Sequence, residues 1–142
     1  MFSGSYAHSV DSKGRIVIPA KFRSRLGEKF VITKGLNGCL WVFPERAWSD
    51  FKQKLTPKSL LDSRGLALER YFLGAAIECV PDAQGRVAIP QILLEHADIK
   101  GDIYIVGLTD RLEIWSKSAW DEFNAKLTDE VIRQLGMETN DN

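Results

Sequence analysis

The sequence predicts a single α+β domain made of two copies of one unit, related by a pseudo-twofold axis. One motif recurs in each half of the 142 residues, and each half alternates short β-branched runs with amphipathic stretches. Neither half has enough strands to be stable alone, because an isolated hairpin is marginal in water. We therefore expect the two units to pack, or interleave, around one shared core.

The repeat is clearest in residues 11–19 (DSKGRIVIP) and 82–90 (DAQGRVAIP), which share five of nine positions at an offset of 71. After one inserted residue the match resumes at an offset of 72, where Trp48 aligns with Trp120. The predicted divisions are a basic unit at 1–55, a linking helix at 56–73, an acidic unit at 74–135 and a frayed tail at 136–142.

Turn residues and apolar spacing place the elements of each unit. Residues 11–14 have the Asp/Ser/Gly composition of a tight turn, so the strands on either side should form a hairpin. The first unit is expected to hold strands at 5–10 and 15–18, a short helix at 19–26, a second strand pair at 30–33 and 40–43, and a helix opened by Pro44. The second unit repeats this order with strands at 74–80, 86–89, 103–106 and 112–115, and the linking helix is expected from residue 60.

The charges are divided unevenly between the two halves. The net charge is zero, yet residues 1–71 hold 13 Lys/Arg against 6 Asp/Glu, and residues 72–142 hold 6 against 13. Such asymmetry is typical of nucleic-acid contact, of self-association, or of both. The first residues lack the pattern of a signal peptide, and no apolar run approaches the ~20 residues of a membrane span. We expect a cytoplasmic protein with no membrane partner.

Motifs of enzymes are absent from the sequence. The two histidines, His8 and His96, stand at non-equivalent positions with no carboxylate or cysteine partner at a telling spacing. Cys39 and Cys79 lie 40 residues apart and form no CxxC pair that would suggest zinc. We expect no catalytic residue, no metal, no cofactor and no small-molecule substrate.

The Asp-x-x-Gly-Arg loops carry the strongest functional signal. Turn chemistry alone explains Asp11 with Gly14, and likewise Asp82 with Gly85, because Asp accepts backbone N–H groups and Gly takes a positive φ. A turn has no need of the arginines at positions 15 and 86. A guanidinium held by a neighbouring carboxylate is prepared to bind phosphate or the O6/N7 edge of guanine.

The first loop lies in the more basic surroundings. Residues 13–29 contain six cations and one acid, whereas the corresponding residues 84–100 contain two of each. The first repeat is therefore the better DNA-facing candidate. The candidate DNA-binding residues are Arg15, Lys13, Arg86, Lys21, Arg23 and Arg25.

The doubled DxxGR loop, followed in each copy by Ile/Val and Pro, resembles the MraZ family over essentially the whole chain. The resemblance implies two AbrB/SpoVT-like units with a swapped-hairpin fold, assembled into octameric or dodecameric rings. It also implies a nucleoid-associated bacterial transcriptional regulator, usually a repressor, that binds short direct repeats of promoter DNA. The implied targets are the division and cell-wall gene cluster, including the regulator's own gene. In that family the loop arginine contacts DNA, which maps onto Arg15 and, by repetition, Arg86.

Two other functions remain open at the level of sequence. A ring-forming assembly protein would act through protein contacts of the acidic half. An antitoxin-like module would mask a toxin through a disordered tail, although only seven residues follow Leu135. The charge division independently favours head-to-tail association into a ring.

Overall fold

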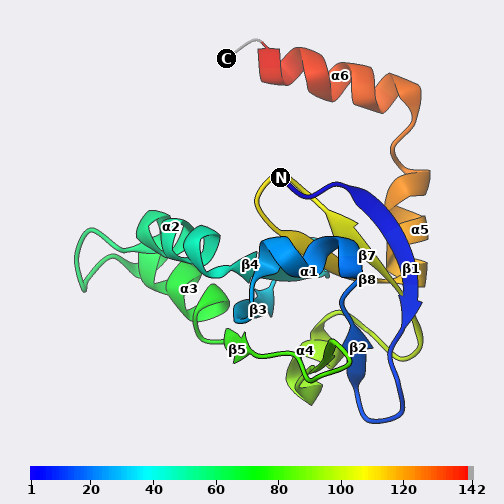
Figure 1. The fold of residues 1–142 in the computed structure, drawn as a ribbon. Helices are drawn as coiled ribbons and strands as arrows, with labels where there is room; N and C mark the ends of the chain where they lie inside the picture. Colours follow the sequence, from blue (N-terminus) through cyan, green and yellow to red (C-terminus); the bar gives the residue numbers. More distant parts are fainter. Residues whose placement is uncertain (141–142) are drawn as a thin grey trace.

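The computed structural model describes residues 1–140 as an antiparallel sheet with helices on both faces (Figure 1). The strands are β1 (Gly4–Ser9), β2 (Arg15–Val17), β3 (Phe30–Lys34), β4 (Leu40–Pro44), β5 (Ile77–Cys79), β6 (Arg86–Ala88), β7 (Asp102–Gly107) and β8 (Leu112–Ser116). The helices are α1 (Ala20–Leu26), α2 (Glu45–Leu55), α3 (Ser63–Phe72), α4 (Gln91–His96), α5 (Lys117–Ala125) and α6 (Asp129–Asn140). None of these helices is long and apolar enough to cross a membrane.

The strands of the two repeats interleave. Six of them form one sheet in the order β1-β7-β8-β4-β3-β5, and the other two form a ribbon, β2-β6. In the two repeats β1 is equivalent to β5, β2 to β6, β3 to β7 and β4 to β8. The β1–β7 pair is therefore equivalent to the β5–β3 pair, whereas the central β4–β8 pair and the β2–β6 ribbon each join two equivalent strands. The expected shared core and twofold arrangement are therefore present in the strand pairing.

The expected hairpins across the Asp-x-x-Gly turns are the main correction. β1 pairs with β7 rather than with β2, and β2 pairs with β6 of the other repeat. The turn itself forms, since Gly14 N–H donates to the Asp11 carbonyl at 3.0 Å. Pairing between repeats brings Ile16 and Val87 together in the core, where both are almost fully buried. Burial of apolar side chains is the reason that the exchanged pairing is favoured.

Side chains of the central strands point alternately to the two faces of the sheet, so the core is divided into two layers. Ile32, Leu40 and Ile114 belong to the layer shared with α1, α4 and the ribbon. Trp41 and Trp115, which point to the opposite face, belong to the layer shared with α2, α3 and α5. The ribbon is thus held by the core on one side, and on its other side the side chains of Arg15 and Arg86 are 28% and 35% exposed.

Two helix boundaries differ from expectation. The linking helix begins at Ser63 because Asp62 caps it, its Oδ1 accepting from Gly65 N–H at 3.2 Å. The tail expected to fray from residue 136 instead continues α6 to Asn140; residues 141–142 lie outside the described part of the chain. Thr128 Oγ1 accepts from Val131 N–H at 3.3 Å, and two acids in the first turn favour the helix.

Candidate nucleic-acid interface

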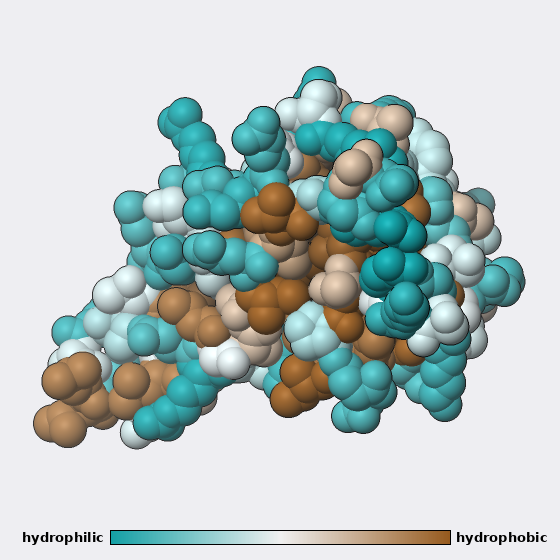
Figure 2. Space-filling view, turned by 60° about the horizontal axis from the view of Figure 1, so that its bottom comes forward, coloured by the Kyte–Doolittle hydropathy of each residue, from teal (hydrophilic) through white to brown (hydrophobic). Residues whose placement is uncertain are grey.

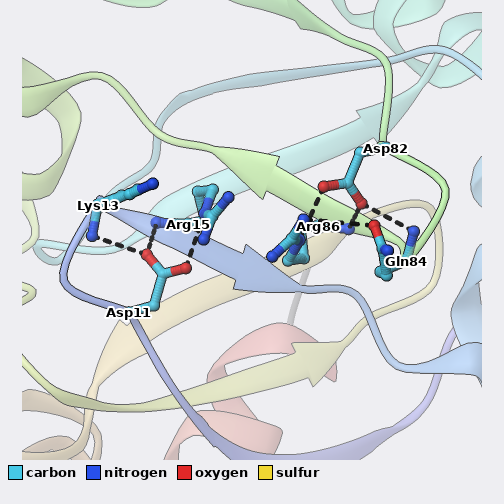
Figure 3. Close-up of polar contacts among 6 residues, drawn as sticks. All are labelled: Asp11, Lys13, Arg15, Asp82, Gln84 and Arg86. Carbon is cyan, nitrogen blue, oxygen red and sulfur yellow. Dashed lines mark hydrogen bonds and ion pairs between the residues drawn. The ribbon is translucent and has the colours of Figure 1, made fainter.

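The two loop arginines lie on one face of the β2–β6 ribbon. Side chains alternate between the faces of a strand, so Arg15 and Arg86 point away from the buried residues Ile16 and Val87. Figure 3 shows the two guanidinium groups lying between the two loops, with Asp11 at one end and Asp82 at the other. The ribbon therefore presents both arginines together.

The pairing register sets the spacing of the two arginines. Arg15 is opposite Ala88, and Arg86 is opposite Val17. The arginines are therefore diagonal neighbours across an antiparallel pair, a relation that separates residues by about 7–8 Å. The two arginines are 71 positions apart in the sequence, and that spacing alone predicted no such closeness in space.

In the first loop, one carboxylate organises both the turn and the arginine. Asp11 Oδ1 accepts from the backbone N–H groups of Lys13 and Arg15, each at 2.9 Å, and Oδ2 accepts from Arg15 Nε at 2.7 Å. The bond from the Arg15 backbone is the largest cause that lowers the pKa of Asp11 below its ordinary value. Since Nε is occupied by Asp11, the two terminal nitrogens of Arg15 are the donors that remain for a ligand.

The second loop repeats this arrangement with one addition. Asp82 accepts from the backbone of Gln84 and Arg86 at 2.9 Å and from Arg86 Nε at 2.8 Å, and its pKa is lowered for the same reason. Gln84 stands where the first loop has Lys13, and its Oε1 accepts from Arg86 Nη2 at 3.3 Å. Within residues 1–140, Arg86 thus has an acceptor that Arg15 lacks, while Lys13 adds a cation beside Arg15.

Each loop is also supported by the helix of the other repeat. Gly14 and Gly85 have φ of 74° and 77°, which L side chains rarely adopt. A Cβ at Gly14 would lie 3.1 Å from Leu94 Cδ1 on α4, and a Cβ at Gly85 would lie 2.4 Å from Arg23 Cζ on α1. Leu94 and Arg23 occupy equivalent positions of the repeat, so the two loops rest on different side chains.

Arg23 is engaged with the protein itself. Its Nε donates to the Ile18 carbonyl at 2.8 Å, and its Nη2 donates to the Gln84 carbonyl at 3.4 Å. The guanidinium therefore spans from the first repeat to the second loop. In the sequence, Arg23 is one of several cations in a basic run. Its contact across the repeats depends on the interleaved strand pairing, which such a run does not indicate.

Lys21 and Arg25 are not brought to the ribbon by these contacts. Lys21 Nζ donates to Tyr6 Oη at 2.8 Å and lies over the same ring, and Arg25 Nη1 donates to the Met1 carbonyl. Both side chains line a hollow beside the N-terminal segment. Their contact with DNA phosphates stays a prediction, made from charge alone.

Lys100 is a cation near the first loop that sequence analysis did not single out. It lines the same surface hollow as Lys13 and Gly14, and its Nζ lies 3.5 Å from Asp98 Oδ1. The signal was present in the sequence, since Lys100 and Arg86 are the two cations in residues 84–100. The contribution of Lys100 was overlooked because two acids in the same stretch bring its net charge to zero.

Neither histidine lies in the ribbon. His8 belongs to β1, and the ring of His96 packs edge-on against Tyr71 with centroids 6.1 Å apart. Burial is the main cause that lowers the pKa of His96 below its ordinary value. Within residues 1–140, no cluster of three His, Cys, Asp or Glu side chains is placed to hold a metal ion.

Comparison with known proteins agrees with this architecture. The family model described as "MraZ protein, putative antitoxin-like" matches residues 1–69 and 72–136. A protein of Caldanaerobacter subterraneus named "Transcriptional regulator MraZ" is 49% identical over 135 residues, covering 95% of this chain and 94% of its own. Proteins of the same name from a Thermoanaerobacter species and from Acetivibrio thermocellus are 48% and 46% identical over 124 residues, covering 87% of each chain.

The match to the family model extends over both repeats and includes the two loops. The family is one of transcriptional regulators and not of enzymes. With two repeated segments in one α+β domain and this degree of identity, the chain belongs to the MraZ family.

Proposed function

We propose that this protein is a sequence-specific DNA-binding transcriptional regulator that inserts the β2–β6 ribbon into the major groove. The observation that carries the proposal is the presence of two carboxylate-held arginines on one partly exposed face of that ribbon. The major groove admits a two-stranded ribbon, and an arginine donor pair matches the O6 and N7 acceptors of guanine.

The spacing of the arginines suits base readout. Successive bases of one strand are about 3.4 Å apart along the duplex axis, so a separation of about 7–8 Å corresponds to roughly two base steps. The pseudo-twofold axis relates Arg15 to Arg86, so each guanidinium approaches the groove in an equivalent way. A single ribbon then reads a short site.

Other cations supply the sequence-independent part of binding. Lys13 and Lys100 lie beside the first loop, and we assign them to phosphates flanking the ribbon. Lys21 and Arg25 contribute to the positive potential of the first repeat. The cation beside the second loop, Arg23, donates to the carbonyls of Ile18 and Gln84, so we expect Arg86 to contribute less than Arg15.

We extend the proposal to fold family, assembly and target on the basis of the family resemblance. The exchanged pairs β1–β7, β5–β3 and β2–β6 support an AbrB/SpoVT-like swapped-hairpin assignment. A ring of eight or twelve subunits would present many ribbons to short direct repeats of promoter DNA, and linked sites gain affinity through effective concentration. The target is the division and cell-wall gene cluster with the regulator's own gene, and the effect is repression.

The test is a titration of the full-length protein onto its own upstream DNA and onto scrambled DNA of equal length, across a salt series. Tighter binding to the native fragment at every salt concentration, with a steep salt slope for both, is the expected result. Equal binding to both fragments would leave an electrostatic, nonspecific binder. Absence of binding at low salt would remove the proposal.

A further inference from the structure

The third position of the Asp-x-x-Gly-Arg motif differs in chemistry between the two loops. Lys13 stands there in the first loop and Gln84 in the second, and both side chains are exposed. Figure 3 shows Gln84 beside Arg86 at one end of the ribbon and Lys13 at the other end. Figure 2, in which the lower end of Figure 1 is turned toward the viewer, shows mostly hydrophilic atoms on the right, the side of the ribbon. The difference therefore changes what each loop offers to a ligand of the arginines.

The contact with Arg86 sets the orientation of the Gln84 amide. Gln84 Oε1 accepts from Arg86 Nη2 at 3.3 Å. A guanidinium only donates, so the amide oxygen faces it and the amide nitrogen is left for another partner. A carbonyl oxygen has two lone pairs, so one of them also remains. Gln84 thus keeps one acceptor and one donor group for a ligand while it is held by Arg86.

The backbone of Gln84 is held on both sides. Its N–H donates to Asp82 Oδ1 at 2.9 Å, and its carbonyl accepts from Arg23 Nη2 at 3.4 Å. In the first loop the residue equivalent to Arg23 is Leu94, whose side chain has no donor for the Lys13 carbonyl. Because Gln84 starts from a fixed position, it loses less conformational entropy when it binds.

An amide with these two groups matches the major-groove edge of adenine. Adenine presents the N7 acceptor and the N6 donor there, and glutamine binds both. An ammonium group has no acceptor for N6, so Lys13 is limited to acceptors such as the guanine edge or a phosphate oxygen. The two loops therefore differ in the bases that they can recognise.

We propose that Gln84 is a specificity-determining residue, which reads an adenine next to the guanine bound by Arg86. Gln84 Oε1 and Arg86 Nη2 are 3.3 Å apart, and successive bases of one strand are about 3.4 Å apart along the duplex axis, so the two side chains suit neighbouring bases. Lys13, at the equivalent place beside Arg15, binds a phosphate. The inference rests on the proposed function and names the base preference of its second loop.

This difference gives the binding site a direction. Two identical loops related by a twofold axis would read a palindromic site, which is the same from either end. Arg15 and Arg86 alone form such a pair. With Gln84 at one end of the ribbon and Lys13 at the other, only one orientation on the duplex places the adenine beside the amide. Each site is therefore bound in one orientation, which suits repeats that all run the same way.

The test measures base preference at every position of one bound site. The probe is the protein's own upstream DNA, shortened to the smallest duplex that the full-length protein binds specifically, with each base pair replaced in turn. In fluorescence anisotropy, replacing the adenine beside a guanine should weaken binding by the wild type roughly 5- to 150-fold, the range for one bidentate base contact. An adenine analogue without the N7 acceptor should weaken it too. A site in which no adenine beside a guanine is preferred would overturn the inference.

Two substitutions at Gln84 separate base reading from support of Arg86. Gln84→Lys removes the acceptor and should abolish the preference for adenine while the preference for guanine stays. Gln84→Glu still accepts from Arg86 but has no donor for N7, so the preference should move from adenine toward cytosine, whose N4 group donates. Gln53→Lys, at an exposed position of α2 on the other layer of the core, adds the same charge and is the matched control. Base preference is a ratio of affinities of one protein, so a loss of folded material does not change it.

The direction is tested by cleavage of DNA beside the second loop. Ala83→Cys places an exposed thiol in that loop, whereas Cys39 and Cys79 are buried, so an iron chelate can be attached to the loop alone. Cleavage should fall on one side of the site, next to the adenine. Lys13→Gln with Gln84→Lys exchanges the two loops' residues, so cleavage should move to the other side. Equal cleavage on both sides, or an unchanged side after the exchange, would overturn the direction.

The outcomes distinguish this inference from the proposed function. If Gln84→Lys keeps the preference of the wild type at every position, while Arg15→Ala with Arg86→Ala loses it, the DNA function stands and the role of Gln84 is removed. If the wild type shows no base preference at any position, both are removed.

Discussion

At the scale of single residues, the loops depend on one carboxylate each. Asp11 accepts two backbone N–H groups and the Nε of Arg15, so it fixes both the turn and the direction of the guanidinium. Asp82 does the same for Arg86. Asp and Gly of the motif are thus structural in their contacts, and the proposed base contacts are left to the terminal nitrogens of the arginines.

Asp11→Asn separates the two roles of the Asp11 carboxylate, which are to hold the turn and to orient Arg15. In Asp11→Asn the Oδ1 acceptor for the backbone remains, but the Nδ2 group cannot accept from Arg15 Nε. We expect unchanged folding and a loss of specific binding of roughly 5- to 150-fold, the equivalent of about 1–3 kcal/mol for one bidentate base contact. Fluorescence anisotropy on operator and scrambled duplexes measures it. An operator affinity equal to that of the wild type would show that Asp11 does not position Arg15.

Arg23 provides a test of support across the repeats. Arg23→Ala removes the side chain that rests against the second loop, so it should reduce specific binding as Arg86→Ala does. Arg23→Leu copies the residue that supports the first loop, Leu94, and should retain more specificity. Lys21→Ala, which leaves both loops intact, should weaken binding to all DNA alike and lower the salt slope by about one for each phosphate that is no longer neutralised. Equal behaviour of Arg23→Ala and Lys21→Ala would argue against a positioning role for Arg23.

The two loop aspartates determine how operator binding should respond to acid pH. Hydrogen bonds from the arginine backbones lower the pKa of both Asp11 and Asp82 below the ordinary value of an aspartate. A depressed pKa in the folded state means that the loops' contribution to stability is complete above the unfolded value and is lost only as pH falls through the folded value. Operator affinity should therefore be constant between about pH 5 and 8. A fall near the ordinary pKa of histidine, in anisotropy titrations across that range, would implicate a group outside the loops.

At the scale of elements, the ribbon exists because the repeats exchange strands. β2 and β6 have three residues each, too few for an independent sheet, and the core beneath them supplies their stability. Each loop joins the ribbon through a glycine with a positive φ, Gly14 or Gly85. Gly85 also lies in close contact with the guanidinium of Arg23. The geometry of the site is thus set by contacts between repeats.

Gly85→Ala tests this close approach. The new Cβ would meet the Arg23 guanidinium, in addition to the backbone cost of a positive φ. Gly38→Ala is the matched control, because Gly38 has φ of 80° but nothing within 4 Å of the new Cβ. Both variants should be destabilised by about 1–3 kcal/mol in urea unfolding. Gly85→Ala should in addition lose specific DNA binding, and an unchanged operator affinity would contradict the tight contact.

The sequence predicted most elements and failed where pairing crosses between repeats. Pro19, Pro44 and Ser116 correctly marked helix starts, and the runs around Ile32 and Ile105 correctly marked strands. Turn composition predicted that the strands beside each Asp-x-x-Gly turn would pair with each other. A turn specifies that the chain reverses, but the partner of each strand is decided by which pairing buries more apolar surface, and that is a property of the whole fold.

At the scale of the whole molecule, the halves differ in charge and in how their last helices are covered. The repeat explains the twofold sheet, but the second repeat leaves α6 without the packing that α3 has in the first. Residues 136–142 are polar on average, and for that reason the sequence predicted a frayed tail there. The apolar face of α6 gives only a weak signal in the sequence, because it consists of Val131, Ile132 and Leu135.

The central claim is that the ribbon arginines read DNA sequence, and one measurement tests it most directly. The ratio of affinities for operator and scrambled duplex is to be measured for wild type, for Lys21→Ala and for the double variant Arg15→Ala with Arg86→Ala, at fixed salt. The account predicts a ratio near that of the wild type for Lys21→Ala, and a ratio of about one for the double variant, with unaltered folding in both. A double variant that still prefers its operator as the wild type does would contradict the account.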